Sequence, residues 1–297
     1  MLLKIGRVLK KTIIHKKLHS SAAFPTMATG EKPGVTLNNI MTVLENFAPK
    51  QLSESWDNTG LLVEPYTPRN ITRILLTNDL TEEVALEATK HCCEMIISYH
   101  PPIFAPLKSV VQSSWKEKIV ALLLENRISL YSPHTSWDSV NGGVNDWLAG
   151  AFHVTESKPV LPGENSTVGA GRFLRLETSI SLSEAIDKVK QHTDLKHVRF
   201  AIGKGKSTTD KICTVALCAG SGASVLKGVD ADLYLTGEML HHDVLDAAQK
   251  GISVILTNHS DSERGFLKIF STNLQNKLDN QVQVLVSKFD RDPLETV

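Results

Sequence analysis

The sequence has few cysteines and no long apolar run, and each of these absences argues against a class of protein. Its 297 residues contain four cysteines, with no Cys-x-x-Cys pair, so a disulfide framework and a cysteine-ligated zinc site are both disfavoured. No apolar run reaches the roughly 18 residues that span a bilayer, so no membrane partner is expected. The hydrophobic content of 41% suffices for one large core or two medium ones.

Positive charge is concentrated at the amino terminus. Residues 1–30 hold six Lys or Arg and no acid, so the remainder carries 26 basic against 32 acidic side chains, which does not favour nucleic-acid binding. The basic, acid-free, amphipathic pattern of residues 1–26 is typical of a mitochondrial transit peptide, and a disordered basic tail is the alternative. A product that starts at Met27 would instead be cytoplasmic, with access to the nucleus.

Short apolar runs that end in a polar residue recur along the chain, and helix-like segments follow them. These runs are 71–79, 94–100, 128–134, 211–220, 231–238 and 252–259. Strands that alternate with helices predict an α/β fold with a largely parallel sheet. A turn-rich stretch at 153–170 predicts a boundary between two α/β lobes, one at 36–152 and the other at 171–297.

The ends of the predicted strands carry candidate metal ligands. In sheets of this kind, ligands bind outside the carboxyl ends of the strands. His100, His134 and His259 each end a predicted strand, and Asp138 and Glu263 follow the last two histidines by four residues. That spacing places an imidazole and a carboxylate on one side of a helical turn. The mixed donor set suits one or two divalent ions, with zinc, manganese and iron as candidates.

Each of these residues also has a purely structural interpretation. A single histidine is more often a hydrogen-bonded core or turn residue than a ligand. Ser260 and Glu263 fit a helix capping box, in which the glutamate reaches back to a backbone amide. The combination of three strand ends, rather than any one residue, favours the metal site.

Two further groups near these strand ends are candidates for supporting roles. His242 stands four residues after Glu238, so on a helix it would be placed for proton transfer, with Glu238 as a supporting neighbour. Asp57 is a candidate partner for one of the histidines.

A Gly-Ser-Gly turn, Gly220–Gly222 with Ser221 between them, lies between a predicted strand and a helix. Its amides could cradle an anion, although a tight packing turn explains the same residues. The stretch 203–207 (GKGKS) is not a phosphate-binding P-loop, because position 200 is Phe200 where that motif requires glycine.

Six motifs together resemble one known family. In order along the chain they are SESWDNTGLLVE (53–64), SYHPPIF (98–104), SPHTSWD (132–138), ALCAGSGAS (216–224), LTGEMLHHD (235–243) and NHSDSERG (258–265). They are similar to the signatures of the NIF-three-like family, also labelled GTP cyclohydrolase I type 2-like. The resemblance implies two α/β lobes with a dinuclear metal site in the cleft between them, and a homo-oligomer that is a dimer or a ring of dimers. It assigns His100, Asp138 and Glu263 to one metal and His259 and Glu263 to the second.

The chain departs from the family pattern at Tyr99. Bacterial members have two adjacent histidines where this chain has Tyr99 and His100. A phenol that titrates near ~10 is a poor ligand at neutral pH, so Tyr99 would support the site from outside. Either His134 replaces the missing imidazole, or the second metal site is weak.

Two classes of function follow from these residues. A metal-dependent hydrolase would use the cation to activate water, with His134 or His242 transferring protons. A non-enzymatic regulatory protein, such as a transcriptional co-regulator with protein partners, would use the metal structurally. The sequence shows no motif that selects a purine nucleotide.

Overall fold

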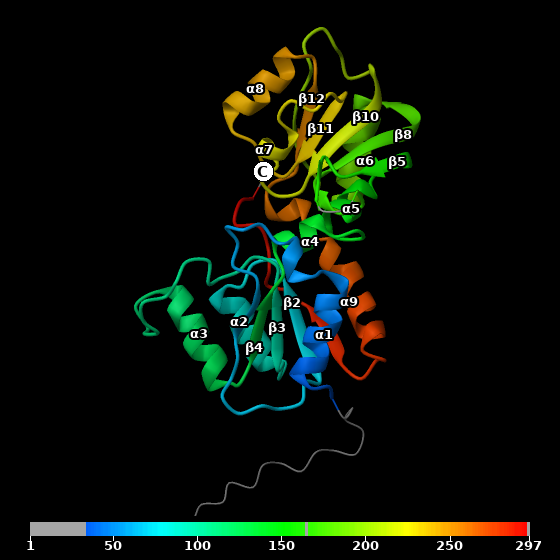
Figure 1. Cartoon of the computed structure of the whole chain (residues 1–297). Helices are drawn as coiled ribbons and strands as arrows, with labels where there is room; N and C mark the ends of the chain where they lie inside the picture. Colours follow the sequence, from blue (N-terminus) through cyan, green and yellow to red (C-terminus); the bar gives the residue numbers. More distant parts are fainter. Residues whose placement is uncertain (1–33, 164–165, 296–297) are drawn as a thin grey trace, which may run out of the picture. The chain divides into compact units, whose positions relative to one another are not determined.

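The first of two main sheets combines strands from both ends of the chain. The computed structural model describes residues 34–163 and 166–295. The first sheet contains, in spatial order, β1 (Gly60–Val63), β4 (Ser129–Ser132), β3 (Met95–Ser98), β2 (Arg73–Thr77) and β13 (Gln283–Val286). The last four of these run parallel, and β1 pairs antiparallel with β4 (Figure 1).

Helices cover both faces of the first sheet, so its strands are apolar on both sides. They are α1 (Leu37–Phe47), α2 (Glu82–Lys90), α3 (Trp115–Glu125) and α9 (Phe266–Lys277). Alternate residues of β2 point to different cores: Ile74 packs with Ile40 and Leu44 of α1, whereas Leu75 packs with Val84 of α2 and Ile119 of α3. Figure 1 accordingly shows α1 and α9 on one face and α2 and α3 on the other.

The second sheet is built around three parallel strands. In spatial order it contains β5 (Val154–Lys158), β8 (Arg172–Ser181), β10 (Lys211–Cys218), β11 (Leu233–Thr236), β12 (Ser253–Leu256) and β9 (Arg199–Ala201). The strands β10, β11 and β12 are parallel, while β5, β8 and β9 pair antiparallel with their neighbours. Its helices are α6 (Leu182–Thr193), α7 (Ala223–Leu226) and α8 (His241–Gln249).

Short elements join the two sheets. They are α4 (Thr135–Ser139), α5 (Val144–Ala149), the 3₁₀ turns η1 (Lys50–Leu52) and η2 (Ser260–Ser262), and a small hairpin of β6 (Leu161–Pro162) and β7 (Gly169–Ala170). One core contains side chains from both sheets, including Ile97 of β3, Trp137 of α4 and Leu217 of β10. The two lobes therefore share apolar packing, which fixes the strand ends that carry the candidate ligands.

The structure confirms the α/β prediction and all six predicted strands, which correspond to β2, β3, β4, β10, β11 and β12. The predicted lobe limits, 36–152 and 171–297, do not coincide with the two sheets. β13 pairs with β2, so the end of the chain returns to the first sheet. The stretch 153–170 contains β5, which pairs with β8 and is therefore part of the second sheet. The basic segment 1–30 lies outside the described residues.

Among the described residues, no helix has both the length and the apolar character needed to cross a membrane.

Candidate metal centre

Two histidines from different strand ends and a glutamate that follows a 3₁₀ turn converge on one point. His100 follows β3 of the first sheet, His259 follows β12 of the second, and Glu263 follows η2. Each of the three offers a ligand atom, and these atoms lie within 4.8 Å of one another. Glu263 lies between the imidazoles: its Oε2 is 3.5 Å from His100 Nε2, and its Oε1 is 3.4 Å from His259 Nε2.

Each imidazole is oriented by a further carboxylate on its other nitrogen. Nδ1 of His100 lies 2.9 Å from Asp79 Oδ1, and Nδ1 of His259 lies 2.8 Å from Glu238 Oε1. A carboxylate acceptor keeps the proton on Nδ1 and leaves Nε2 free to coordinate, which is the usual arrangement behind metal-ligating histidines. Both Nε2 atoms face Glu263.

Glu263 is buried and held in place by several donors. Its side chain is 3% exposed, and Asn78 Nδ2 donates to its Oε2 at 2.9 Å. Burial raises the pKa of Glu263, but His100, His259 and Asn78 outweigh burial and keep the pKa below its usual value. Burial lowers the pKa of His100, yet Glu263 and Asp79 raise it well above the ordinary value. Glu263 is therefore ionised, and its buried negative charge requires positive charge nearby.

The spacing of the three side chains fits a divalent cation. Bonds of ~2.0–2.1 Å from one metal to nitrogen and oxygen put tetrahedral neighbours about 3.3–3.4 Å apart, close to the observed Nε2–carboxylate distances. Gly220 leaves the necessary room, because a Cβ atom there would lie 2.5 Å from Glu263 Oε1 and 3.2 Å from His259 Nε2. Because the two oxygens of Glu263 face different imidazoles, the carboxylate is also suited to bridging two cations.

Asp138, one of the predicted ligands, lies beside the three-residue group but is not part of it. Its Oδ1 accepts a hydrogen bond of 2.6 Å from Tyr99 Oη. Burial raises the pKa of Asp138 to about 6, while the hydrogen bond from Tyr99 acts in the opposite direction. Burial also raises the pKa of the Tyr99 phenol well above its usual value, so Tyr99 is a neutral donor to Asp138.

His134 is held next to the cluster by Asp57. Its Nδ1 lies 2.8 Å from Asp57 Oδ1, and the side chain of Asp57 is fully buried. The ring of His134 is 5.3 Å from that of His100. His134 has a φ of +37° with a ψ of −117°, a strained backbone conformation of the kind that occurs at functional sites. The predicted partnership between Asp57 and a histidine is thus present, with His134.

The structure does not support a capping box at Ser260. Ser260 begins η2 and its hydroxyl donates to Asp292, while the carboxylate of Glu263 contacts the histidines and Asn78. The segment forms a 3₁₀ turn rather than the first turn of an α-helix, so the two side chains do not meet in the capping geometry.

The Gly-Ser-Gly turn is a packing turn. The amide of Gly220 donates to Ser262 Oγ, and that of Gly222 donates to Thr236 Oγ1. These amides are therefore not available to the anion that the sequence suggested, and α7 behind them has only four residues. The alternative interpretation, a tight turn, describes Gly220 correctly, and nothing shows Ser221 binding an anion.

His242 has no contact with the cluster among the described hydrogen bonds, ion pairs and ring contacts. α8 begins at His241 and Leu240 is its N-cap, so Glu238 lies before the helix and the expected helical spacing does not exist. The ring of His242 instead lies 5.3 Å from that of His241. Glu238 supports His259, as described above.

Sequence reasoning gave no role to two residues that directly follow β2, Asn78 and Asp79, which contact Glu263 and His100. The strand-end rule that located His100 could have found them. It also missed the pair of Arg264 and Asp290, whose Nε and Oδ2 are 3.3 Å apart. Asp290 also accepts the backbone amide of Asn78, at 2.6 Å. Asp290 lies in an irregular segment after β13, where no periodic pattern marks it.

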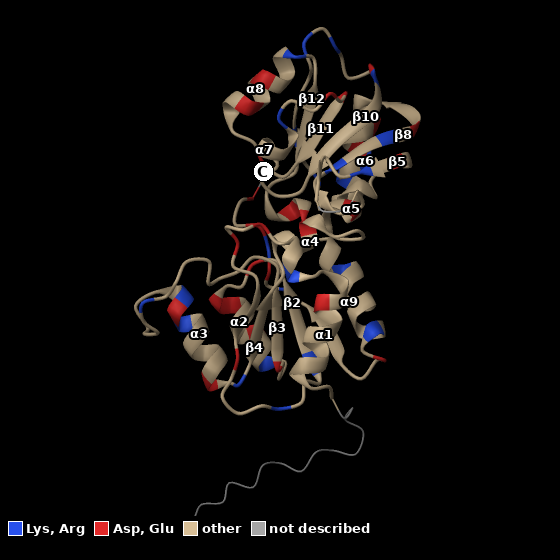
Figure 2. Ribbon diagram, in the orientation of Figure 1, with Lys and Arg blue, Asp and Glu red and all other residues tan. Residues whose placement is uncertain are grey.

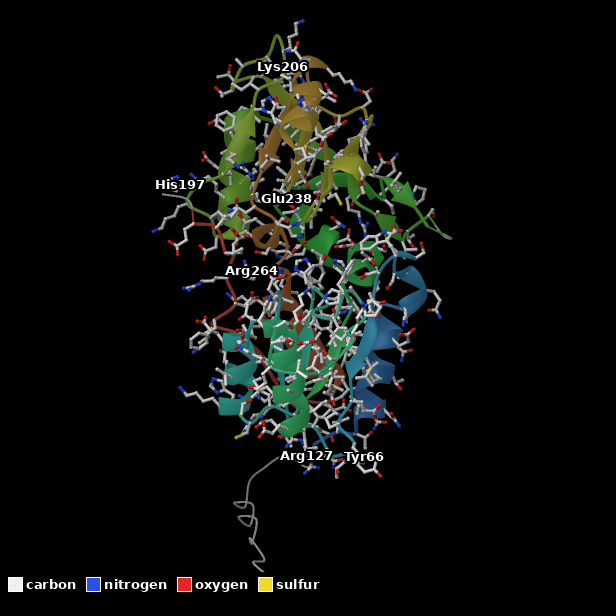
Figure 3. All side chains as sticks on the ribbon, turned by 90° about the vertical axis from the view of Figure 1, so that its left-hand side faces the viewer. Tyr66, Arg127, His197, Lys206, Glu238 and Arg264 are labelled. Atoms are coloured by element: carbon white, nitrogen blue, oxygen red, sulfur yellow. The ribbon has the colours of Figure 1, made fainter. Side chains whose placement is uncertain are left out.

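Carboxylates surround the cluster, and this favours a cation there. Besides Glu263 of the cluster itself, they belong to Asp57, Asp79, Asp138, Glu238 and Asp290. Figure 2 shows acidic positions around α4 and the segments next to it. In Figure 3, Glu238 and Arg264 are both labelled in the region between the two sheets.

These features define a two-sheet α/β protein with a histidine–carboxylate site suited to a divalent cation. The Duf34/NIF3 (NGG1p interacting factor 3) family matches residues 35–293, and the chain belongs to this family.

Two relatives agree with this assignment, and one solved structure shares the fold. A Drosophila melanogaster protein named NIF3-like protein 1 is 48% identical over 89% of this chain and 90% of its own length. The Saccharomyces cerevisiae NGG1-interacting factor 3 is 38% identical over 87% of this chain and 96% of its own length. The structure of a Bacillus cereus protein related to NIF3 has the same fold, with a TM-score of 0.78 and 22% identity over 88% of this chain and 99% of that one.

Proposed function

We propose that the protein is a divalent-metal-dependent hydrolase whose centre is held by His100, His259 and Glu263. The observation that supports this most strongly is the arrangement of a buried carboxylate between two imidazoles that are each backed by an acid. Zinc, manganese and iron all accept this donor set. Glu263 would bridge if two ions bind.

A bound divalent cation supplies Lewis-acid stabilisation of negative charge on oxygen and makes water acidic enough to act as a nucleophile near neutral pH. The side chains next to the cluster supply the rest. Asp138, with a pKa of about 6, can accept a proton near neutral pH, and Tyr99 holds its carboxyl in one orientation. His134, fixed by Asp57, can deliver a proton to a leaving group. The reaction class is hydrolysis at an electrophilic carbon or phosphorus.

This proposal is tested with metal-loaded protein on GTP and on p-nitrophenyl phosphate. We expect the wild-type protein to hydrolyse at least one of them. Glu263→Gln should lose both its bound metal and this activity. Asp138→Asn should keep its metal, and its turnover should fall by ~10²–10⁴-fold. Arg199→Gln, which changes an exposed strand residue of the second lobe, is the control and should not alter turnover. Metal-loaded protein that hydrolyses neither compound would contradict the proposal.

The name of the yeast relative supports a second candidate, a protein that acts by binding another protein. In this case the metal would stabilise the fold, and the protein would bind its partner without hydrolysing any substrate. NGG1 is the partner to test first. Binding of NGG1 that is equally tight in wild type and Asp138→Asn, without hydrolysis in either, would favour this function, and failure to bind would count against it.

We also propose that the protein assembles into a dimer or a ring of dimers, as the family resemblance implies. Sedimentation of the full chain as a monomer at micromolar concentration would contradict this.

A further inference from the structure

A second pocket lies at the opposite edge of the first sheet from the metal centre. Its volume is about 430 Å³, which is in the range of small-molecule sites. Its lining includes Asn70 and Ile71 just before β2, Glu94 just before β3, and Ser129 at the start of β4. The metal centre lies beyond the carboxyl ends of the same strands. In Figure 3, Arg127 of this pocket is at the end of the first lobe away from Arg264, which contacts Asp79.

Two arginines enter this pocket with unused hydrogen-bond donors. Arg69 and Arg127 both line it, and the Nε atom of each is buried without a hydrogen-bond partner. The Nη2 of Arg69 donates to the Asn126 carbonyl, and the Nη2 of Arg127 lies 3.4 Å from the carbonyls of Thr67 and Pro68. These contacts use one terminal nitrogen of each guanidinium. Figure 2 shows basic positions at this end of the lobe.

Glu64 and Glu94 also line the pocket, and neither pairs with these arginines among the described residues. Within the described residues, neither Arg69 nor Arg127 forms an ion pair with a carboxylate. Glu94 directs its Oε2 to the backbone amides of Thr72 and Arg73, each at 2.8 Å. Burial lowers the pKa of Arg69; Glu94 opposes this effect and the like charge of Arg127 adds to it. An anion between the guanidiniums would relieve their mutual repulsion.

The backbone adds two further observations. The amino end of α1 lines the pocket through Thr36, Leu37 and Asn38. Thr36 Oγ1 caps the Asn39 amide, and the first turn carries no acid, so the positive dipole end of the helix is available to an anion. Arg127 occupies the left-handed position after α3, with φ +58°, in a Schellman turn closed by the Ile128 amide on the Leu123 carbonyl. Gly or Asn is favoured there, so arginine is not the residue that the local backbone prefers.

We propose that this pocket binds a small molecule through a phosphate group, with Arg69, Arg127 and the amino end of α1 as its receptors. Guanidinium groups match the oxygens of a phosphate with two parallel hydrogen bonds, and two of them suit its double charge. The remaining volume accommodates the body of a small phosphate ester. The pocket is separate from the metal centre, so the proposal does not depend on the proposed hydrolysis.

The test is calorimetric titration of the full chain with inorganic phosphate and with glycerol 3-phosphate, in a chloride buffer of constant ionic strength. We expect saturable binding of one equivalent, with a dissociation constant of about 1 mM or below for at least one of the two. Tighter binding of the ester assigns the site to a phosphorylated metabolite, whereas tighter binding of inorganic phosphate assigns it to the free ion. Absence of saturable binding of both overturns the proposal.

Matched variants locate the binding. Arg69→Gln and Arg127→Asn should each weaken it by tenfold or more, whereas Arg199→Gln should not change it. Arg127→Asn places a favoured residue at the left-handed position, so it should unfold at a temperature no lower than wild type, and its loss of binding cannot be attributed to misfolding. Glu263→Gln separates the two sites, because phosphate at the pocket persists in that variant. Binding that disappears in Glu263→Gln and survives in both arginine variants overturns the proposal and places the phosphate at the metal centre.

Discussion

Gly220 contributes to the metal centre by having no side chain. Its φ of +65° is in the left-handed region, and the space that a Cβ atom would need is taken by Glu263 and His259. Glu263 cannot easily move away, since it is buried and bonded to Asn78. A glycine at this place is therefore required both by the turn and by the ligands.

We expect Gly220→Ala to lose most of its bound metal, because the added methyl displaces the carboxylate. Gly228→Ala is the matched control: Gly228 also has a positive φ, +83°, but nothing lies within 4 Å of its missing Cβ. Both variants should lose about 1–2 kcal/mol of unfolding free energy from backbone strain. Only Gly220→Ala should lose metal in elemental analysis, and equal metal contents would contradict the role of Gly220.

The acids behind the histidines give a second prediction at this scale. Glu238→Gln removes the charged acceptor of His259 Nδ1, so metal affinity should fall by ~10–100-fold while His259 itself remains. The exposed Glu156, which pairs with Lys158, provides the control as Glu156→Gln. Competition with a chelating dye measures both affinities. An unchanged affinity in Glu238→Gln would show that Glu238 does not orient the imidazole.

At the scale of single elements, β8 holds α5, and with it the neighbouring α4 that carries Asp138, through the ion pair of the buried Arg172 with Asp146. Arg172 is 3% exposed in its side chain and donates to both oxygens of Asp146 on α5. It also donates to the carbonyl of Val140, just after α4. On the other side of α5, Asn145 accepts the amide of Ala219 and donates to the Asp138 carbonyl. The position of α4 and α5 therefore depends on contacts with the second sheet.

Replacing Arg172 by leucine should lower the unfolding free energy by about 3–5 kcal/mol, because Asp146 and three backbone carbonyls lose their donor. Arg175 lies on the same strand with 59% of its side chain exposed, and Arg175→Leu should change stability by less than about 1 kcal/mol. Urea unfolding followed by circular dichroism compares the two. Similar losses in both variants would mean that Arg172 contributes no more than a surface charge.

The elements that were predictable from sequence are those with strong local patterns. The six apolar strands and the histidines at three of their ends follow from burial on both faces of a parallel sheet and from the position of ligands at carboxyl ends. β13 and β5 were missed because their partners, β2 and β8, are chosen by long-range packing rather than by local pattern. The roles of Asp138 and His242 depended on helical geometry that only the three-dimensional structure defines.

At the scale of the whole molecule, the metal centre joins two lobes that are also linked by apolar packing. His100, which follows a strand of the first sheet, and His259, which follows a strand of the second, both contact Glu263. In the segment after β13, Asp290 accepts the backbone amide of Asn78. The second pocket lies at the other edge of the first sheet. The two proposed sites are therefore chemically different, one for a cation and one for an anion.

The basic amino-terminal segment gives a prediction for the whole chain in the cell. Residues 1–30 fused to a fluorescent reporter should direct it to mitochondria, because the segment is cationic, acid-free and amphipathic. A reporter fused to the chain that starts at Met27 should stay in the cytoplasm or reach the nucleus. Diffuse fluorescence from the first fusion would contradict the targeting prediction.

The central claim is that His100, His259 and Glu263 hold a divalent cation, and elemental analysis per subunit tests it most directly. We expect one or two equivalents of zinc, manganese or iron in the purified full chain and less than about a tenth of an equivalent in a correctly folded Glu263→Gln variant. If the second site is weak, Tyr99→His should raise the content from near one equivalent to near two. Metal content that is the same in Glu263→Gln as in wild type would contradict the claim.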